Sequence, residues 1–582
     1  MKNVKLLLIA LTAVVLAACQ KDASVGLIPA DALLVGQANV QDILQKSDLL
    51  NSKLIKELKS SIKEYNSSSL AKIYSKCFDD PSETGLDISQ PLYMFVTGQA
   101  EYMGFVASVE SEGKLKELIT AMRKADDSAG EYIGKVREGE GFSYVLFDEE
   151  DEYRDGILAF SNKAALLLAP MNKRAGKHID DYAEELFAQK GSDSFFGTDN
   201  YKSLSSQDGD VKFVLSAESL PTQALPSQLR RQLNKMLPDD ASLNDFRMIA
   251  SLAFEKGELL AALRVYSDNK SLQKQIESGF EQAGLQSIDG LYTSLFDDQD
   301  SYGWASLNIN GEKLMEGLQE IGLKSEVDSE TWSFLKRYLA NIDGDVSVAL
   351  DAHTTEMPSV KFKAHVNDSF SFRKQDLTML FGEDNVDTDG DGQYTLYETS
   401  GSWDWVYDEY TGSYDYVQTS KTRKPIVSLG KVGDDVYAGN VISSYRGMNG
   451  SSSKKLRAFE TQIHKSVAFG LFNASSIIGL LVDVQESEKS YCESRVRLAS
   501  SSDYYDYYDT PEYWQERLDE CVNRIAFIES LKDLLSSATL SVSPDGQVEG
   551  RLRFVKESEN AGKQIVDFVD KTLKTYGTSL FD

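Results

Sequence analysis

The 582-residue chain has few cysteines, few prolines and a shortage of positive charge. Its 4 Cys and 11 Pro exclude a small fold held together by disulfides and a collagen-like or proline-rich chain. The 61 Lys and Arg against 91 Asp and Glu give a net charge of −30, which repels phosphate backbones, so nucleic acid is not an expected partner. Hydrophobic residues still make up 41% of the chain, and its length corresponds to at least two domains, each with its own core.

Long hydrophobic runs are also scarce, and the one that stands out is too short to cross a bilayer as a permanent helix. Residues 6–18 form a hydrophobic stretch behind Lys2 and Lys5, which is typical of a secretion signal. The stretch ends with Leu-Ala-Ala before Cys19, and this ending resembles the bacterial lipobox, where the cysteine becomes the first residue and receives acyl chains such as palmitate. We therefore expect a signal peptide at residues 1–18, a lipidated tether at residues 19–26, and a membrane partner reached through the lipid anchor.

The residues after Cys19 bear on the cellular location. Gln20 stands where an Asp would retain an enteric lipoprotein in the inner membrane. The run Gln20-Lys21-Asp22 is similar to the start of the tag that exports Bacteroidetes lipoproteins to the cell surface, although Ala23 interrupts it. The resemblance implies a cell-envelope lipoprotein of the outer membrane and leaves open whether it faces the periplasm or the cell surface.

The rest of the chain repeats one order of expected elements. Residues 249–283 are expected to form a strand, a turn, a second strand and an amphipathic helix, because hydrophobic residues alternate and then recur every three to four positions. The same order appears at residues 92–124, 346–381 and 538–574, and each copy is preceded by another strand and helix. The repeated unit is therefore expected to be βαββα.

The copies are arranged in pairs. Further strands are expected at residues 142–169 and 393–441, which follow only the first and third units. We predict an α+β fold built by internal duplication, with two similar halves at residues 27–295 and 296–582, each of two βαββα units with antiparallel sheets and packed helices. Three leading strands end on an asparagine that we expect to cap the next helix: Asn39, Asn308 and Asn473.

Two segments resemble a known family. Residues 28–32, Ile-Pro-Ala-Asp-Ala, open the mature region, and residues 87–93, Asp-Ile-Ser-Gln-Pro-Leu-Tyr, lead into the first hairpin. Both resemble an uncharacterised family of Bacteroidetes lipoproteins, a domain of unknown function, over most of the chain. The resemblance implies a location and a fold, and no chemistry.

One acidic segment has the spacing of a calcium loop. Asp387, Asp389 and Asp391 alternate before a glycine, and Glu398 occupies the twelfth position of the motif, as in an EF-hand. Residues 393–398, however, are expected to form a strand, as at the matching place of the first half, so Glu398 would lie too far from the ion. Two interpretations remain, namely calcium held by the three Asp with backbone oxygens, or an acidic turn exposed to solvent.

Aromatic residues and cysteines supply the other candidate sites. Trp403, Trp405 and Tyr407 belong to an expected long hairpin, where they form either a face that binds sugar rings or envelope proteins, or cross-strand pairs that cover a core. Cys492 and Cys521 flank a tyrosine-rich link between two expected helices. In an oxidising envelope we expect them to form a disulfide that closes a loop of about 30 residues.

Catalytic motifs are missing from the sequence. It contains no nucleophile elbow, phosphate-binding loop, dinucleotide-binding glycine pattern or metalloprotease helix, so an enzyme is less expected than a non-catalytic protein. The sequence favours a cell-envelope lipoprotein that serves as a binding or structural scaffold for an unknown ligand, with calcium as its one candidate cofactor. The alternative is a surface protein that binds or processes glycans through the aromatic residues near 403–416.

Overall fold

The structure forms two compact units. This computed structural model describes residues 24–576 apart from gaps at 66–67, 126, 149–152, 220–225, 227–229, 232–233, 235–236, 291, 299–300, 321, 352–358, 391, 409–412, 441–452 and 502–509. Unit 1 comprises the chain up to Lys274 together with the C-terminal segment from Arg551, and unit 2 comprises Gln275–Gly550. Helices and antiparallel strands occur in both units, so the predicted α+β class is confirmed.

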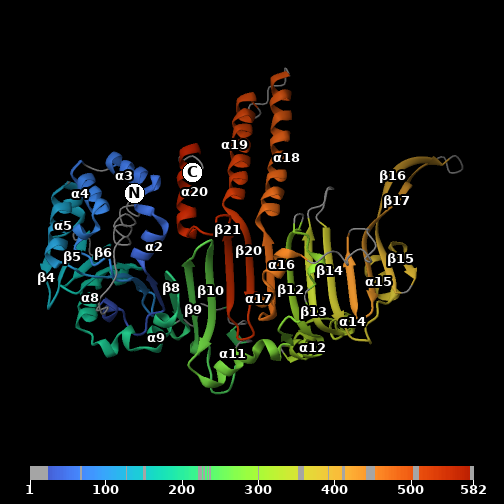
Figure 1. The fold of residues 1–582 in the computed structure, drawn as a ribbon, viewed down its shortest axis with the longest axis horizontal. Helices are drawn as coiled ribbons and strands as arrows, with labels where there is room; N and C mark the ends of the chain where they lie inside the picture. The colour runs from blue at the N-terminus through green and yellow to red at the C-terminus, as the bar shows by residue number, and fades with distance from the viewer. Residues whose placement is uncertain are drawn as a thin grey trace. The chain divides into compact units, whose positions relative to one another are not determined.

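Unit 1 is built on an antiparallel sheet in the order β10–β9–β8–β1–β2–β3–β7–β6–β5–β4 (Figure 1). The alternation of hydrophobic residues in these segments explains why they form strands with two distinct faces. The bounds are β1 (Leu34–Ala38), β2 (Leu92–Val96), β3 (Tyr102–Ser108), β4 (Arg137–Glu138), β5 (Ser143–Phe147), β6 (Gly156–Phe160), β7 (Ala164–Pro170), β8 (Val211–Ser216), β9 (Phe246–Phe254) and β10 (Glu258–Ser267).

Helices lie on both faces of this sheet. One face packs Phe95, Leu166 and Val214 against buried residues of α8 and α9. The other face packs against the apolar side of α5 and against Val40 of α2. The bounds are α2 (Val40–Ser47), α3 (Lys53–Tyr65), α4 (Ser68–Asp79), α5 (Glu112–Ala125), α6 (Asp127–Tyr132), α7 (Lys173–Lys177), α8 (Ile179–Ala188) and α9 (Asp199–Ser206).

The C-terminal segment completes unit 1. Here the strand β21 (Val548–Phe554), which begins in unit 2 and enters unit 1 at Arg551, pairs with β10, and the backbone N–H of Phe554 donates to the carbonyl of Gly257 over 2.8 Å. In α20 (Ala561–Tyr576), the Asp570 carboxylate accepts hydrogen bonds from the backbone N–H groups of Lys53 and Leu54, at 2.6 and 2.9 Å. These are the free N–H groups at the start of α3, so Asp570 caps that helix from a distant part of the chain. The limits of compact packing therefore differ from those of the predicted halves at residues 27–295 and 296–582.

Unit 2 has its own antiparallel sheet in the order β20–β19–β12–β13–β14–β18–β17–β16–β15. The short strand β11 also pairs with β12. The bounds are β11 (Leu285–Gln286), β12 (Ser301–Asn310), β13 (Ile342–Asp351), β14 (Ser359–Val366), β15 (Val386–Gly390), β16 (Gln393–Asp408), β17 (Ser413–Val432), β18 (Asp435–Gly439), β19 (Ala468–Asn473) and β20 (Leu535–Val542).

The helices of unit 2 include a long helical hairpin. Its two arms, α18 (Ala474–Ser501) and α19 (Pro511–Ser530), run side by side in Figure 1 and pack along their length. A separate core joins the sheet residues Trp304 and Phe469 to Leu456 and Ile463 of the preceding short helices. The other bounds are α11 (Lys270–Gln282), which begins in unit 1, α12 (Gly311–Glu320), α13 (Leu323–Glu326), α14 (Ser329–Leu339), α15 (Lys374–Phe381), α16 (Lys454–Arg457) and α17 (Glu460–His464).

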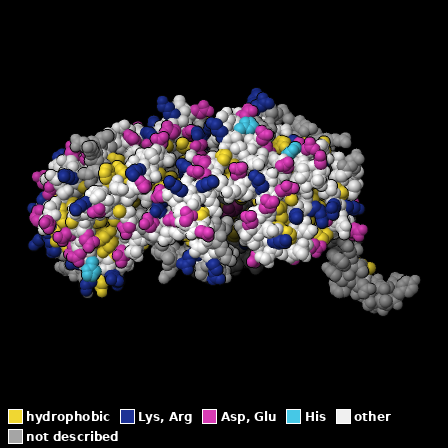
Figure 2. All heavy atoms as spheres, turned by 90° about the horizontal axis from the view of Figure 1, so that it is seen from below, with side chains coloured by type: hydrophobic (Ala, Val, Ile, Leu, Met, Phe, Trp, Pro, Cys, Tyr) yellow, Lys and Arg dark blue, Asp and Glu magenta, His cyan; other side chains and the backbone are white. Residues whose placement is uncertain are grey.

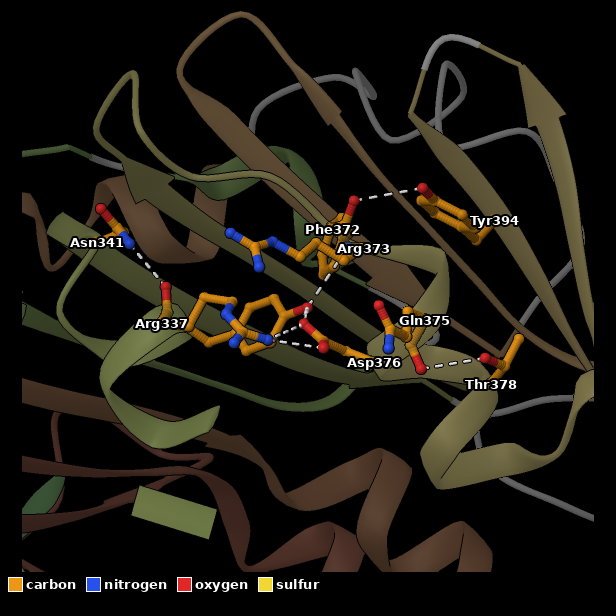
Figure 3. A network of polar contacts seen from close by, with 9 residues as sticks. Arg337, Asn341, Phe372, Arg373, Gln375, Asp376, Thr378 and Tyr394 are labelled. Atoms are coloured by element: carbon orange, nitrogen blue, oxygen red, sulfur yellow. Dashed lines mark hydrogen bonds and ion pairs between the residues drawn. The ribbon is translucent and has the colours of Figure 1, made fainter. Parts of the chain in front are cut away.

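A network of polar contacts joins α14 to α15 (Figure 3). The Arg337 guanidinium donates to both oxygens of the Asp376 carboxylate, each at 2.6 Å, and the Tyr338 hydroxyl donates to the same carboxylate over 2.8 Å. Burial alone would raise the pKa of Asp376, but the bonds from Arg337 and Tyr338 outweigh it and hold the pKa below its usual value. The carboxylate therefore stabilises the folded protein at neutral pH.

Replacing Asp376 with Asn is expected to lower the free energy of unfolding by about 1 to 2 kcal/mol at pH 7, because charge-assisted hydrogen bonds are lost from a largely covered site. A lowered folded-state pKa gives stability that is present above the unfolded pKa and is lost as the pH falls through the folded pKa. The difference between Asp376→Asn and the unmodified protein should thus disappear in acid, which urea unfolding at several pH values measures. The exposed Asp368 supplies the control variant Asp368→Asn, and a gap that persists in strong acid would contradict the electrostatic explanation.

The described surface is mixed in charge. On the face shown in Figure 2, acidic and basic side chains lie interspersed with small hydrophobic areas. Among the described residues, none of the helices combines the length and the apolar composition that crossing a membrane requires.

Candidate functional site

An apolar cavity of about 110 Å³ lies in unit 1, between one face of the sheet and helices α4 and α5. Strands β2, β3, β6 and β7 form its floor, and the two helices cover it. The lining residues are Ile73, Tyr74, Cys77, Thr84, Leu86, Leu92, Phe105, Ala107, Leu115, Leu118, Ile119, Met122, Leu158, Ala165 and Leu167.

The cavity exists because small residues face each other in its floor. Ala107 of β3 pairs directly with Ala165 of β7, and both are at least 95% buried. The next pair on the same face is Phe105 with Leu167, whose side chains are large. Two methyl groups beside a pair of large side chains leave space between the sheet and the helices that cover it.

Helices α4 and α5 cover the cavity with apolar residues that recur at helical spacing. In α5 the lining residues Leu115, Ile119 and Met122 recur at intervals of four and three, which places them on one side of the helix. In α4 the lining residues Tyr74 and Cys77 are three positions apart and lie on one side for the same reason. Each helix therefore turns an apolar stripe toward the cavity.

The few polar atoms in the lining are neutral. Burial, with a contribution from Cys77, raises the pKa of Tyr74, and burial is also the largest cause of the raised pKa of the Cys77 thiol. The Thr84 hydroxyl donates to the carbonyl of Pro81 over 2.7 Å and accepts from the N–H of Leu86 over 3.2 Å. None of the described lining residues carries a charge at neutral pH, so an ion would lose its hydration among them without compensation.

The outer side of α4 is charged. Lys76 forms an ion pair with Glu83, and this pairing is the largest cause of the lowered pKa of Glu83. Lys114 lies 3.8 Å from the other oxygen of Glu83 and donates to the carbonyl of Ser82 over 3.2 Å. Thus α4 has a charged outer side and an apolar side that lines the cavity.

The predicted lipidation and disulfide sites have different outcomes. Cys19 lies outside the described residues. Cys492 of α18 and Cys521 of α19 are both fully buried thiols, and each has 0% of its surface exposed. They are hydrogen-bonding neighbours in the core of the helical hairpin. The structure thus brings the two predicted cysteines together, while the disulfide bond itself stays a prediction.

The acidic segment forms a β-hairpin. Residues 393–398 lie in β16, so the prediction of a strand there is confirmed, and Glu398 pairs with Lys424 of β17. Asp387 lies in β15 opposite Thr395, and the bond from Arg423 is the largest cause of its lowered pKa. Asp391 and the side chain of Asp389 lie outside the described part. Among the described residues no cluster of acidic, His or Cys side chains is suited to a metal ion, and the calcium site stays a prediction.

The aromatic residues of the expected hairpin lie on a long strand. Trp403, Trp405 and Tyr407 occupy β16 opposite Gln418, Tyr416 and Tyr414 of β17, respectively. The predicted hairpin is therefore confirmed. The side chains of the three aromatic residues fall outside the described part, so the proposed sugar-binding face stays a prediction.

The sequence pattern did not predict the cavity. Alternation in residues 102–108 and 164–170 indicates which side chains share a strand face, but it does not tell which residues of two distant strands stand opposite each other. The pairing of Ala107 with Ala165 depends on that register. The signal that the sequence holds is an alanine at positions 107 and 165, each two residues from a large side chain, Phe105 or Leu167, on the same strand face.

Comparisons with known proteins give a family and no activity. A family model described as "Domain of unknown function (DUF4836)" matches residues 25–375, which include the cavity. No curated protein matches the chain. A solved structure described as "Structure of crystal form I of TP0453" aligns with 12% identity and a TM-score of 0.23, over 46% of this chain and 89% of that chain. That likeness supports no conclusion about fold or function.

Proposed function

We propose that this chain, which belongs to the DUF4836 family, is a cell-envelope lipoprotein that binds an apolar group in the cavity under α4 and α5 without transforming it chemically. The observation that carries the proposal is a preformed space whose lining is hydrocarbon apart from three neutral polar side chains. Preformed apolar sites with few polar groups are typical of ligand-binding proteins.

The size and chemistry of the cavity support binding rather than catalysis. Its 110 Å³ is close to the roughly 150 Å³ of an engineered apolar cavity that stays dry and takes up benzene. The described residues of its lining include no carboxylate, lysine, arginine or histidine, and the Cys77 thiol is held neutral by its raised pKa. A site of this kind gains binding energy from burying hydrocarbon, and it has no group that moves a proton.

The location in this proposal comes from the N-terminal sequence. Cleavage before Cys19 and acylation of that cysteine would tether the two units to the outer membrane through residues 19–26. A protein held at a membrane surface encounters apolar molecules at high local concentration. The anchor and the cavity are therefore compatible parts of one function.

We also infer that the fold arose by internal duplication. The inference is supported by the strand order β8–β1–β2–β3–β7–β6–β5–β4 in unit 1 and β19–β12–β13–β14–β18–β17–β16–β15 in unit 2. Each strand of the first order has its counterpart, eleven strands later in the numbering, at the same place in the second. Chance is a poor explanation for such an agreement over eight strands.

Benzene binding tests the proposed cavity function. Benzene at one hundred times its dissociation constant is expected to raise the free energy of unfolding by about 2.7 kcal/mol, because it binds only the folded protein. The variant Ala107→Leu fills the space and should remove this stabilisation. Thermal unfolding with and without benzene measures both effects.

Two further variants keep this test decisive. Ala188 is exposed at the end of α8, so Ala188→Leu adds the same side chain away from the cavity and should respond to benzene like the unmodified protein. If Ala107→Leu does not fold, Ala165→Val narrows the same space by a smaller volume. An equal response to benzene in a folded, filled variant would contradict the proposal, as would the absence of any response in the unmodified protein.

A further inference from the structure

The floor of the cavity continues as an apolar row across the sheet of unit 1. Leu158, Leu167 and Phe105 line the cavity and stand opposite one another on β6, β7 and β3. The row goes on in register through the strands β2, β1, β8, β9 and β10. Its further members are Met94, Gly36, Phe213, Ala250 and Leu263. Residues that pair directly point to the same face of a sheet, so all eight belong to one face.

The rows on either side are apolar as well. Two residues away in each strand, β1, β8, β9 and β10 carry side chains on the same face, and none of these is polar or charged. One such row is Leu34, Leu215, Met248 and Val265, and the other is Ala38, Val211, Leu252 and Ala261. We call these two rows, together with the row that leaves the cavity, the apolar strip.

The strip is less covered than the opposite face of the same strands. Met94, Phe213, Ala250 and Leu263 are only partly buried. On the opposite face Phe95 is 0% exposed, Val214 2% and Ile249 6%, because α8, α9 and their neighbours cover that side. Apolar side chains that remain partly open to water across several strands are a feature of binding surfaces.

The strip is continuous beside the cavity. A methyl group built on Gly36 would lie 2.7 Å from Cε1 of Phe213 and 2.9 Å from Cγ of Met94, so these two side chains close over the glycine from either side. Phe105 lines the cavity and pairs with Met94. Hydrocarbon surface therefore extends without interruption from the cavity to Phe213.

The length of the strip indicates the shape of the ligand. Five strand intervals separate Phe105 from Leu263, which at 4.7 to 4.9 Å each amount to about 24 Å. A compact ring system of the size of the cavity would leave this surface unused. A single extended hydrocarbon chain has the shape to place its end in the cavity and its length along the strip.

We propose that the ligand is a single-chain fatty acid, whose methyl end fills the cavity and whose chain lies along the apolar strip toward Leu263. This inference rests on the proposed function and adds the class of ligand. The contacts are hydrocarbon throughout, so affinity depends on the number of methylene groups rather than on a specific polar contact.

Titration calorimetry with octanoate, laurate and palmitate tests this inference. Affinity is expected to rise about fourfold for each added methylene, which corresponds to the ~0.8 kcal/mol gained on burying one CH₂. The variant Ala250→Glu places a charge on the strip about 19 Å beyond Phe105, where the far end of palmitate lies, and should reduce the gain between octanoate and palmitate. Its benzene binding should be unchanged, because Ala250 does not line the cavity.

A matched control lies on the same strand. Ala253 pairs with Leu260 on the opposite face of β9 and is also partly buried, so Ala253→Glu should keep the dependence on chain length. If Ala250→Glu does not fold, Phe213→Gln tests the same strip with an uncharged group closer to the cavity.

The outcomes separate the two proposals. Benzene stabilisation without a dependence on chain length would overturn the fatty-acid inference and leave the cavity function standing. Loss of both would overturn both proposals. A two-chain phospholipid that binds more tightly than palmitate would overturn the assignment to a single-chain ligand, and equal losses in Ala250→Glu and Ala253→Glu would overturn the path along the strip.

Discussion

Replacing Phe95 with Ala is expected to lower the free energy of unfolding of unit 1 by about 3 to 5 kcal/mol, one of the two largest effects that we predict. The Phe95 side chain is completely buried in the core between β2 and the helices α8 and α9. Removing its ring takes away buried hydrocarbon and leaves a cavity that rigid neighbouring strands cannot close.

The partner of Phe95 explains why this position is unusually sensitive. Gly104 stands directly opposite on β3, and a methyl group built on Gly104 would overlap the Phe95 ring. The ring thus occupies the space that any other residue at position 104 would need. Gly104→Ala should therefore also destabilise unit 1, through crowding instead of lost contact.

Urea unfolding combined with amide hydrogen exchange in β2 and β3 measures both effects, because the exchange reports on unit 1 specifically. Phe196 is 53% exposed, so Phe196→Ala is the control and should cost about 1 kcal/mol or less. A cost for Phe95→Ala no larger than that of the control would contradict the packing described here.

Oxidation of Cys492 and Cys521 is expected to stabilise the helical hairpin by about 3 to 4 kcal/mol, since a bond that closes a loop of about 30 residues restricts the unfolded chain. The two thiols are neighbours, and burial, followed by Glu488 and Cys492, raises the pKa of Cys521. The reaction removes two protons and two electrons, which oxidised glutathione accepts by thiol–disulfide exchange. It should be faster at alkaline pH, where more of the thiol is ionised.

Peptide mapping without reduction should show one peptide pair that links α18 to α19 and is lighter by two hydrogen atoms than the separate thiol peptides. The melting temperature of the oxidised protein should exceed that of the reduced protein. In the double variant Cys492→Ser with Cys521→Ser this dependence on redox state should vanish, while Cys77→Ser should keep it. A bond between Cys77 and either partner, or equal melting temperatures, would contradict the predicted pairing.

Side-chain contacts near the two cysteines join α18 to α19. Glu488 pairs with Arg517 at 3.1 Å across the two helices, one turn from Cys492. Toward the tip the ring of Trp514 lies edge-on to Tyr491, with 5.7 Å between centroids. These contacts hold the helices together before any bond forms, so the disulfide would add to an existing arrangement.

Local sequence patterns determined the type and order of the elements. The alternation in residues 249–254 and 259–266 indicates two strands, and the structure has them as β9 and β10. The same reasoning placed Glu398 on a strand, which β16 confirms. The hydrophobic face of a strand or a helix depends on the spacing of a few neighbouring residues, so the sequence alone is sufficient to predict it.

Helix capping shows where local reasoning fails. The predicted caps were wrong: Asn39 makes no capping bond, and the amide of Asn308 donates to Asp345 over 2.7 Å. Asn473 donates to the hydroxyl of Ser476. At the start of α12 another residue takes the role, since the strand β12 runs on to Asn310, whose side chain accepts from the N–H of Lys313.

By itself the sequence determined the α+β class, the hairpins and the acidic balance of the chain, because each depends on composition or on short-range spacing. The lipid anchor stays a prediction. Only the tertiary structure decided the register that sets Ala107 against Ala165, and with it the cavity. It also decided that the chain beyond Arg551 packs on unit 1 and that Cys492 lies against Cys521. These features join residues that are tens to hundreds of positions apart, and their partners are chosen by the packing of whole elements, which no short segment encodes.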